Sequence, residues 1–234
     1  MSTRKSNSKY NLVVTSHADD ETIFFGALIL ARRKLPWRIV CVTDGNADGQ
    51  GTLRKKQFEK ACLLLGVKQH DWLGFPDIYE QRLKTDKLSA YLKNLPAPQE
   101  IFTHGILGEY GHPHHQDVSY AVHQAFAKHP KLYSVAWNCY PDLIVKINPA
   151  QYKKKCQILA NVYGSETRRF FNLLPSVAME GFAQVKPTEV ETLYHFLKNG
   201  QPLNRARLKH FKWLWLHLNE QAKELGPNAR PRLF

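Results

Sequence analysis

The sequence predicts an α/β fold with a mostly parallel sheet, helices on both of its faces, and a C-terminal helical extension. Over the first 150 residues, short apolar runs rich in branched residues alternate with helix-like stretches. The apolar runs are nearly continuous, which is typical of parallel strands buried on both faces. Polar clusters follow several of the runs, at the edge where open α/β sheets bind their ligands.

The individual elements follow from hydrophobic periodicity. Residues 10–16 (YNLVVTS) and 38–43 (RIVCVT) are the clearest strands, because β-branched and aromatic residues dominate them. Shorter strands are expected at residues 72–74, 100–104 and 133–140. Apolar or small residues at 58, 61, 62 and 65 repeat at helical spacing. Helices are expected at residues 21–33, 53–65, 87–94, 115–127 and 153–162.

The last fifty residues differ in composition. Residues 186–234 hold nine Lys or Arg against four Glu, a net charge of +5. A helical stripe runs through Leu208, Phe211, Trp215, Leu218, Ala222 and Leu225. We therefore divide the chain into a domain of residues 1–185 and a basic helical extension of residues 186–234 that packs on this domain. The alternative is that this extension rests on an anionic membrane surface.

Composition limits the class of protein. With 234 residues, 43% of them hydrophobic and 23% charged, the chain suits one globular domain with an appendage. The longest apolar run, residues 23–31, has about half the roughly 20 residues of a transmembrane helix, so none is expected. The apolar stretch at residues 12–14 is too short for a secretory signal, so a cytoplasmic location is expected.

Cysteines and charge give two further expectations. The four cysteines are widely spaced without a Cys-x-x-Cys pair, which favours reduced structural thiols. The net charge of +13 favours anionic partners such as nucleic acid, acidic membrane surface or phosphorylated substrates. No nucleic-acid-binding motif accompanies the charge, so no nucleic-acid partner is expected. Homo-oligomer formation is left open.

A first chemical motif, Ser16-His17-Ala18-Asp19-Asp20-Glu21, follows the first strand directly. Its adjacent carboxylates would repel each other unless a cation balanced them. His17 and Asp20, three positions apart around a tight turn, can reach one ion, while Asp19 can face a water molecule on that ion. The alternative reading is that Asp19 is only a helix N-cap.

A second motif, residues 108–115 (GEYGHPHH), follows the strand at 100–104. His115 would complete a set of two imidazoles and one carboxylate, which leaves positions open for water as catalytic zinc sites do. Ferrous iron suits the same ligands. Asp19 could then remove a proton from the water, and a charged His112 could stabilise an oxyanion. The alternative is a surface histidine cluster that binds metal adventitiously.

These residues resemble the PIG-L/LmbE-like N-acetylglucosaminyl deacetylase family. Residues 17–21 resemble its His-Pro-Asp-Asp-Glu signature, and residues 110–115 resemble its second histidine motif. Further similarity lies in Thr43-Asp44-Gly45, in residues 73–77 (LGFPD) and in Tyr163-Gly164-Ser165. The resemblance covers about residues 10–185. The fold it implies is Rossmann-like, in agreement with the strand and helix pattern.

The resemblance also implies an activity and roles for residues. It implies a zinc-dependent hydrolase that removes the N-acetyl group from an N-acetylglucosamine-type sugar in a larger conjugate. The implied zinc ligands are His17, Asp20 and His115. Asp19 would be the general base that later protonates the leaving amine, His112 the charged partner of the oxyanion, and Tyr110 a contact of the substrate carbonyl. The implied substrate-binding residues are Arg54 and Asp77.

Three positions depart from the family pattern: Ala18 replaces a proline, His114 an aspartate, and Gln57 an acidic residue. None of them removes a ligand, but the turn at Asp19 could be softer. Two alternatives remain: a metal-dependent amidase for another N-acyl amine, such as a thiol conjugate, and a metal-binding relative without activity. The positive charge predicts a substrate with an anionic portion. Peripheral contact with the inner face of an anionic membrane is a further alternative.

Overall fold

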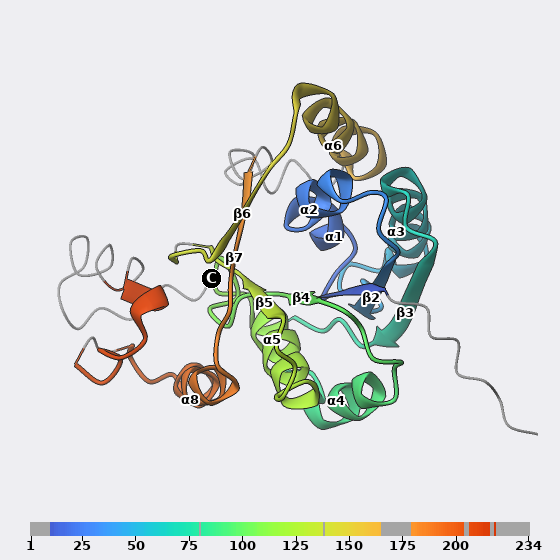
Figure 1. The fold of residues 1–234 in the computed structure, drawn as a ribbon. Helices are drawn as coiled ribbons and strands as arrows, with labels where there is room; N and C mark the ends of the chain where they lie inside the picture. The colour runs from blue at the N-terminus through green and yellow to red at the C-terminus, as the bar shows by residue number, and fades with distance from the viewer. Residues whose placement is uncertain are drawn as a thin grey trace, which may run out of the picture.

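The computed structural model describes residues 10–79, 81–137, 139–164, 179–203, 206–215 and 218. Seven strands of these residues form one sheet, in the order β3-β2-β1-β4-β5-β7-β6 (Figure 1). The strands are β1 Asn11–Thr15, β2 Trp37–Thr43, β3 Gln69–Phe75, β4 Ile101–Thr103, β5 Leu132–Val135, β6 Leu143–Lys146 and β7 Met179–Ala183. The helices are α1 Asp20–Ile23, α2 Gly26–Ala31, α3 Gly51–Leu65, α4 Thr85–Lys93, α5 Pro113–Ala125, α6 Pro149–Val162 and α8 Pro187–Lys198.

The strand order places the ends of β1 and β4 together. Strands β3, β2, β1, β4 and β5 are parallel, whereas β7 runs antiparallel to both β5 and β6. The chain builds outward from β1 to β3 and then returns to add β4 on the other side of β1. Loops leave this switch point in opposite directions, which makes it the ligand-binding crevice of such sheets. Both sequence motifs lie there.

Helices cover both faces of the sheet (Figure 1). Helices α1, α2, α3 and α6 lie on one face, and α4 and α5 on the other. Strand β1 supplies both cores, because Val13 packs into the first and its neighbours Leu12 and Val14 into the second. A strand buried on both sides needs apolar residues at successive positions. The α/β prediction is therefore confirmed.

Three local predictions were wrong. The helix expected at 21–33 is two helices, α1 and α2, separated at Phe24 and Phe25. The carboxylate of Glu180 accepts the backbone N–H groups of Ala27 and Leu28 at 2.6 and 2.8 Å, so α2 has its own capped start. The strand expected at 133–140 ends at Val135, and β6 and β7 were not predicted.

The C-terminal part also differs from the prediction. Helix α8 packs on α5. The helix expected from Leu208 onward does not form before residue 215: residues 206–210 are turns, and Lys212–Leu214 is a 3₁₀ helix. Leu208 and Leu218 are buried, and Trp215 packs against the same cluster. The last two residues of the expected stripe, 222 and 225, lie outside the described residues. The domain boundary at residue 186 stays a prediction.

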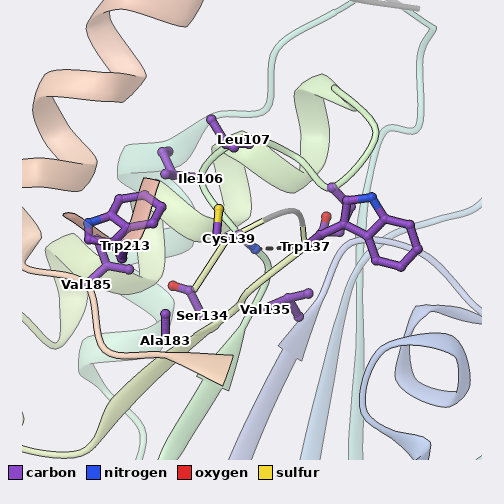
Figure 2. A pocket seen from close by; sticks show the side chains of 11 residues that line it. Ile106, Leu107, Ser134, Val135, Trp137, Cys139, Ala183, Val185 and Trp213 are labelled. Carbon is purple, nitrogen blue, oxygen red and sulfur yellow. Dashed lines mark hydrogen bonds between the residues drawn. The ribbon is translucent and has the colours of Figure 1, made fainter. Parts of the chain in front are cut away.

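A small cavity lies where the apolar cluster of α8, Leu208 and Leu218 meets the sheet (Figure 2). Trp213 and Trp137 line it from opposite sides, with Cys139 between them in this view. The indole N–H of Trp213 donates to Glu189 of α8 at 3.0 Å, which ties the 3₁₀ helix to α8. Glu109 also belongs to the wall of the cavity, so this packing reaches the loop that follows β4.

All four cysteines carry free thiols, and three of them are buried. No helix among the described residues combines the length and apolar character that crossing a membrane would require.

Candidate metal centre

The first half of the site is the loop between β1 and α1. The backbone N–H of His17 donates to the Asp20 carboxylate at 2.7 Å, which closes the tight turn. Asp19 has a φ of 99°, a region that side chains other than glycine rarely adopt. The turn therefore aims Asp19 and Asp20 in different directions, as the sequence predicted.

Buried hydrogen bonds hold Asp19 in this conformation. Glu21 accepts the Asp19 backbone N–H at 3.0 Å, and the Tyr163 hydroxyl donates to Glu21 at 2.9 Å. Arg54 donates to the Ala18 carbonyl at 2.8 Å. These contacts fix the turn although alanine stands where the family motif has proline. Gly45 makes room for them: its φ is 58°, and a Cβ there would lie 3.2 Å from the Arg54 side chain.

The carboxylate of Asp19 is buried beside Arg54. Its Oδ2 accepts no hydrogen bond from any described residue, and Nη2 of Arg54 lies 3.6 Å from it. Burial and the charge of Asp20 raise the pKa of Asp19 well above its ordinary value, while Arg54 opposes the shift. The structure thus places Arg54, a predicted substrate contact, against the predicted base.

The second half of the site is the start of α5. His112 caps the helix, because its Nδ1 accepts the backbone N–H of His114 at 3.2 Å, and Pro113 occupies the first helical position. This geometry places His115 in the first turn, where it points back towards the end of β1. His115 is fully buried.

The structure brings His17, Asp20 and His115 together. Nδ1 of His17 lies 3.3 Å from Nε2 of His115 and 3.5 Å from Oδ2 of Asp20, and Nε2 of His115 lies 3.6 Å from Oδ1 of Asp20. Tetrahedral ligands with bonds of 2.0–2.1 Å are separated by about 3.3 Å. One donor atom from each of the three residues lies within 4.8 Å of the other two, so together they can hold one metal ion. Although burial opposes it, Asp20 and Asp77 raise the pKa of His17 to about 10, so the pocket favours a cation.

Glu109 orients the His115 ring, a contact that the sequence analysis missed. Its Oε2 accepts the Nδ1–H of His115 at 2.5 Å and lies 3.1 Å from Nδ1 of His104. Although burial opposes it, His104 and His115 lower the pKa of Glu109 to about 2, so the carboxylate accepts and does not donate. Nε2 of His115 therefore keeps its lone pair for a metal, the usual role of a carboxylate behind a histidine ligand.

We predict that Glu109→Gln weakens zinc binding by about 10–100-fold, as is usual when such a partner of a ligand is lost. The neutral amide accepts the Nδ1–H less strongly and no longer fixes the His115 tautomer. Competition titration with a zinc indicator measures the change, and Glu59→Gln on the exposed surface of α3 is the control. Equal zinc affinity of both variants would show that Glu109 has no role behind His115.

His112 and Tyr110 lie beside the three ligands. The His112 ring is 4.8 Å from that of His115 between centroids, and the Tyr110 ring is 5.5 Å from it. The structure differs from the expected charged state of His112. Its Nδ1 accepts a hydrogen bond, and burial and the neighbouring imidazoles lower its pKa, so the ring is neutral with its proton on Nε2. A neutral ring still offers that N–H to an oxyanion.

Asp77 faces histidines, although it was predicted to line the sugar site. Its Oδ1 lies 3.3 Å from Nδ1 of His114 and 3.6 Å from Nε2 of His17. Burial opposes ionisation here, but these two imidazoles hold the pKa of Asp77 below its ordinary value. Gln57, the third departure from the family motif, donates to the carbonyl of Val162 and thereby joins α3 to α6.

The signal for the missed residues was weak. Glu109 stands inside the second motif and His104 ends the preceding strand, but neither spacing distinguishes a ligand from its supporting partner. Glu21 belongs to the first motif, but an acidic residue at that position is equally typical of the first turn of a helix. Their roles depend on contacts that the fold creates.

This chain is similar to known proteins in sequence. The family model described as PIG-L, GlcNAc-PI de-N-acetylase, matches residues 12–126, which include both motifs. N-acetylglucosaminyl-phosphatidylinositol de-N-acetylase of Bos taurus is 32% identical over 141 residues, covering 53% of this chain and 54% of that protein. A probable N-acetyl-alpha-D-glucosaminyl L-malate deacetylase 2 of Bacillus cereus is 29% identical over 145 residues, covering 53% and 63%. The chain thus spans only part of the length of these relatives.

Solved structures agree on the fold. N,N'-diacetylchitobiose deacetylase from Pyrococcus horikoshii superimposes with a TM-score of 0.58 at 19% identity, covering 78% of this chain and 85% of that one. Residues 12–126, which carry both histidine motifs at the switch point of the sheet, match the PIG-L family of de-N-acetylases.

Proposed function

We propose that this protein is a metal-dependent hydrolase that removes the N-acetyl group from an N-acetylglucosamine-type sugar within a larger conjugate. The products are acetate and the free amino sugar. The family match supports the reaction, and both curated relatives carry an N-acetylglucosaminyl group in the name of their substrate. The observation that carries the proposal is the juxtaposition of the His17, Asp20 and His115 donors with the buried Asp19 carboxylate.

The donor set suits zinc, and ferrous iron suits it as well. An ion bound there would supply Lewis acidity, lowering the pKa of a water molecule and polarising the amide carbonyl. His17, Asp20 and His115 would hold such an ion, and a set of three protein ligands leaves positions for water and substrate. Glu109 and the turn at Asp19 keep these donors in place.

The protein's own groups can then move the protons. Asp19 takes a proton from the attacking water, whose oxygen forms a bond to the carbonyl carbon. Nε2–H of His112 donates to the oxygen on which negative charge develops, and Tyr110 contacts the same carbonyl. When the C–N bond breaks, Asp19 returns the proton to the leaving nitrogen. Arg54, 3.6 Å from Asp19, favours the anionic carboxylate and so opposes the rise in its pKa that burial and Asp20 cause.

We further propose that the conjugate carries an anionic portion. The chain has a net charge of +13, and the substrates named for the two curated relatives contain phosphatidylinositol and malate, both anionic. Charge attraction of this kind weakens when salt screens it.

Acetate release from a panel of compounds tests both proposals. The panel contains N-acetylglucosamine conjugates with anionic and neutral aglycones, together with N-acyl amines that lack a sugar, including thiol conjugates. We expect the zinc-loaded protein to prefer the anionic sugar conjugates, with a KM that rises with ionic strength. Equal KM values at low and high salt would contradict the anionic portion, and cleavage restricted to sugar-free amides would contradict the sugar.

A further inference from the structure

Arg82, on the loop that follows β3, binds the start of α5. Its Nη1 donates to the carbonyl of Pro113 at 2.9 Å and to Oδ1 of Asp117 at 3.1 Å. Its Nη2 donates to Oε1 of Gln116 at 2.9 Å. All three acceptors belong to the first turns of the helix that carries His115. One side chain thereby ties this loop to the second half of the metal centre.

The residues on both sides of Arg82 are fixed to the same helix. Oδ2 of Asp117 accepts the backbone N–H of Leu83 at 2.8 Å, and Nε2–H of His114 donates to the carbonyl of Gln81 at 2.8 Å. Because these contacts fall at successive positions of the loop, the loop and the start of α5 are held as one unit.

Gln116 extends this unit to the loop that follows β4. While its Oε1 accepts a hydrogen bond from Arg82, its Nε2 donates to the carbonyl of Leu107 at 3.3 Å. The two segments are in close contact, since a Cβ added at Gly108 would lie 3.0 Å from Cγ of Gln116. Glu109, the carboxylate behind a predicted metal ligand, follows directly in this loop. The guanidinium of Arg82 is thus linked to that segment through one side chain.

Helix α8 supports the cluster from beside α5 (Figure 1). The hydroxyl of Tyr194 donates to Oδ1 of Asp117 at 2.8 Å, and its ring stacks on that of Tyr120 with centroids 4.0 Å apart. The guanidinium carbon of Arg82 lies 5.8 Å from the centre of the Tyr194 ring, a distance typical of cation–π contacts. The buried carboxylate of Asp117 therefore receives donors from the loop and from α8 at once.

We propose that Arg82 is a positioning residue for deacetylation and that Tyr194 of α8 supports it. The inference rests on the proposed function. Arg82 acts through α5 and not on the substrate: the Pro113 carbonyl that it binds belongs to the residue next to His112, the proposed donor to the oxyanion. Fixing this turn sets the positions of His112 and His115 before the substrate arrives, so the reaction need not organise them.

The competing role for Arg82 is direct binding of an anionic portion of the substrate, because its side chain is 27% exposed. The two roles differ in their kinetics. Loss of a positioning residue lowers kcat for every substrate, whereas loss of an anion contact raises KM for anionic conjugates alone.

Steady-state kinetics of Arg82→Met on anionic and neutral N-acetylglucosamine conjugates separate these roles. We expect kcat to fall by about 10²-fold on both, as a small displacement at a reacting centre can cause, with KM unchanged. Arg82→Lys keeps a cationic donor without the fork and should recover part of kcat. Arg38→Met, which breaks a partly buried ion pair with Asp71 between β2 and β3, is the matched control and should keep the kcat of wild type.

Two results would overturn the positioning role: an unchanged kcat in Arg82→Met, or a rise in KM restricted to anionic conjugates. Thermal melting checks that each variant is folded at the assay temperature. Tyr194→Phe should also lower kcat, but by less than Arg82→Met, with Tyr120→Phe in the stacked ring as its control. Wild-type kcat in Tyr194→Phe would contradict the role of α8.

Hydrogen exchange gives a readout that does not depend on activity. In the zinc-loaded protein, the amides of residues 105–116 should exchange faster in Arg82→Met than in wild type, while those of β1 and β2 keep their rates. Equal exchange of residues 105–116 in the two proteins would overturn the inference even if acetate is released. Faster exchange in the variant, with no acetate release by wild type from any substrate, would contradict the proposed function and leave the link between loop and helix standing.

Discussion

Asp19→Asn is expected to keep the metal bound and to lower kcat by about 10²–10⁴-fold, the usual contribution of a general base. Asparagine has the size of aspartate and tolerates positive φ, so the turn at 99° should persist. The amide cannot accept the proton of the attacking water, while the ligands His17, Asp20 and His115 are unchanged. Metal content by elemental analysis and kcat from acetate release measure the two effects.

Two further variants make this result specific. Asp86→Asn removes an exposed carboxylate of α4 and should behave as wild type, whereas His17→Ala should lose the metal itself. A fully active Asp19→Asn variant would show that Asp19 is not the base. Loss of metal from Asp19→Asn would instead assign Asp19 to the ligands.

Lys155→Met is expected to lower the free energy of unfolding by about 3–5 kcal/mol, the usual effect of removing one partner of a buried ion pair. Lys155 and Glu180 are buried, and Nζ of Lys155 donates to Glu180 at 2.6 Å and to the carbonyl of Ile23 at 2.9 Å. Without the lysine, the end of α1 and a carboxylate lose their charged partner. Urea denaturation measures the change, with Lys153→Met on the exposed side of α6 as the control.

A double variant tests the reason for this instability. Adding Glu180→Gln to Lys155→Met removes the unpaired charge and should recover part of the stability, because the amide oxygen can still accept one backbone N–H. No recovery would indicate that packing of the lysine stem against Gly26, and not the charge, is what matters. The pair also holds the break between α1 and α2, where Phe24 packs 5.9 Å from the His115 ring. We therefore expect Lys155→Met to weaken metal binding as well.

Much of the site could be predicted because local patterns and topology suffice for it. A nearly continuous apolar strand such as β1 indicates a buried parallel sheet, and a polar motif after it must lie at the carboxyl edge. The same argument holds for the motif after β4. The strand order then brings the two loops together, and His17, Asp20 and His115 meet with the spacing of metal ligands.

Other features have no local signal. The start of α2 after its break from α1 is capped by Glu180 of β7, which contacts Ala27 and Leu28 across more than 150 positions of sequence. No periodicity within residues 21–33 reports such a partner. The C-terminal stripe had helical spacing from Leu208, but residues 206–214 form turns and a 3₁₀ helix, and among the described residues of the stripe only Trp215 and Leu218 are helical.

The sequence by itself determined the sheet, the edge at which the chemistry lies and the residues that gather there, because these follow from burial and chain direction. Tertiary structure alone decided how each group is held. It set Glu109 behind His115, placed Asp77 against His17 and His114, and left His112 neutral with Nδ1 as a helix cap. Proton positions and ring orientations depend on individual hydrogen bonds between distant residues, and those exist only once the chain has folded.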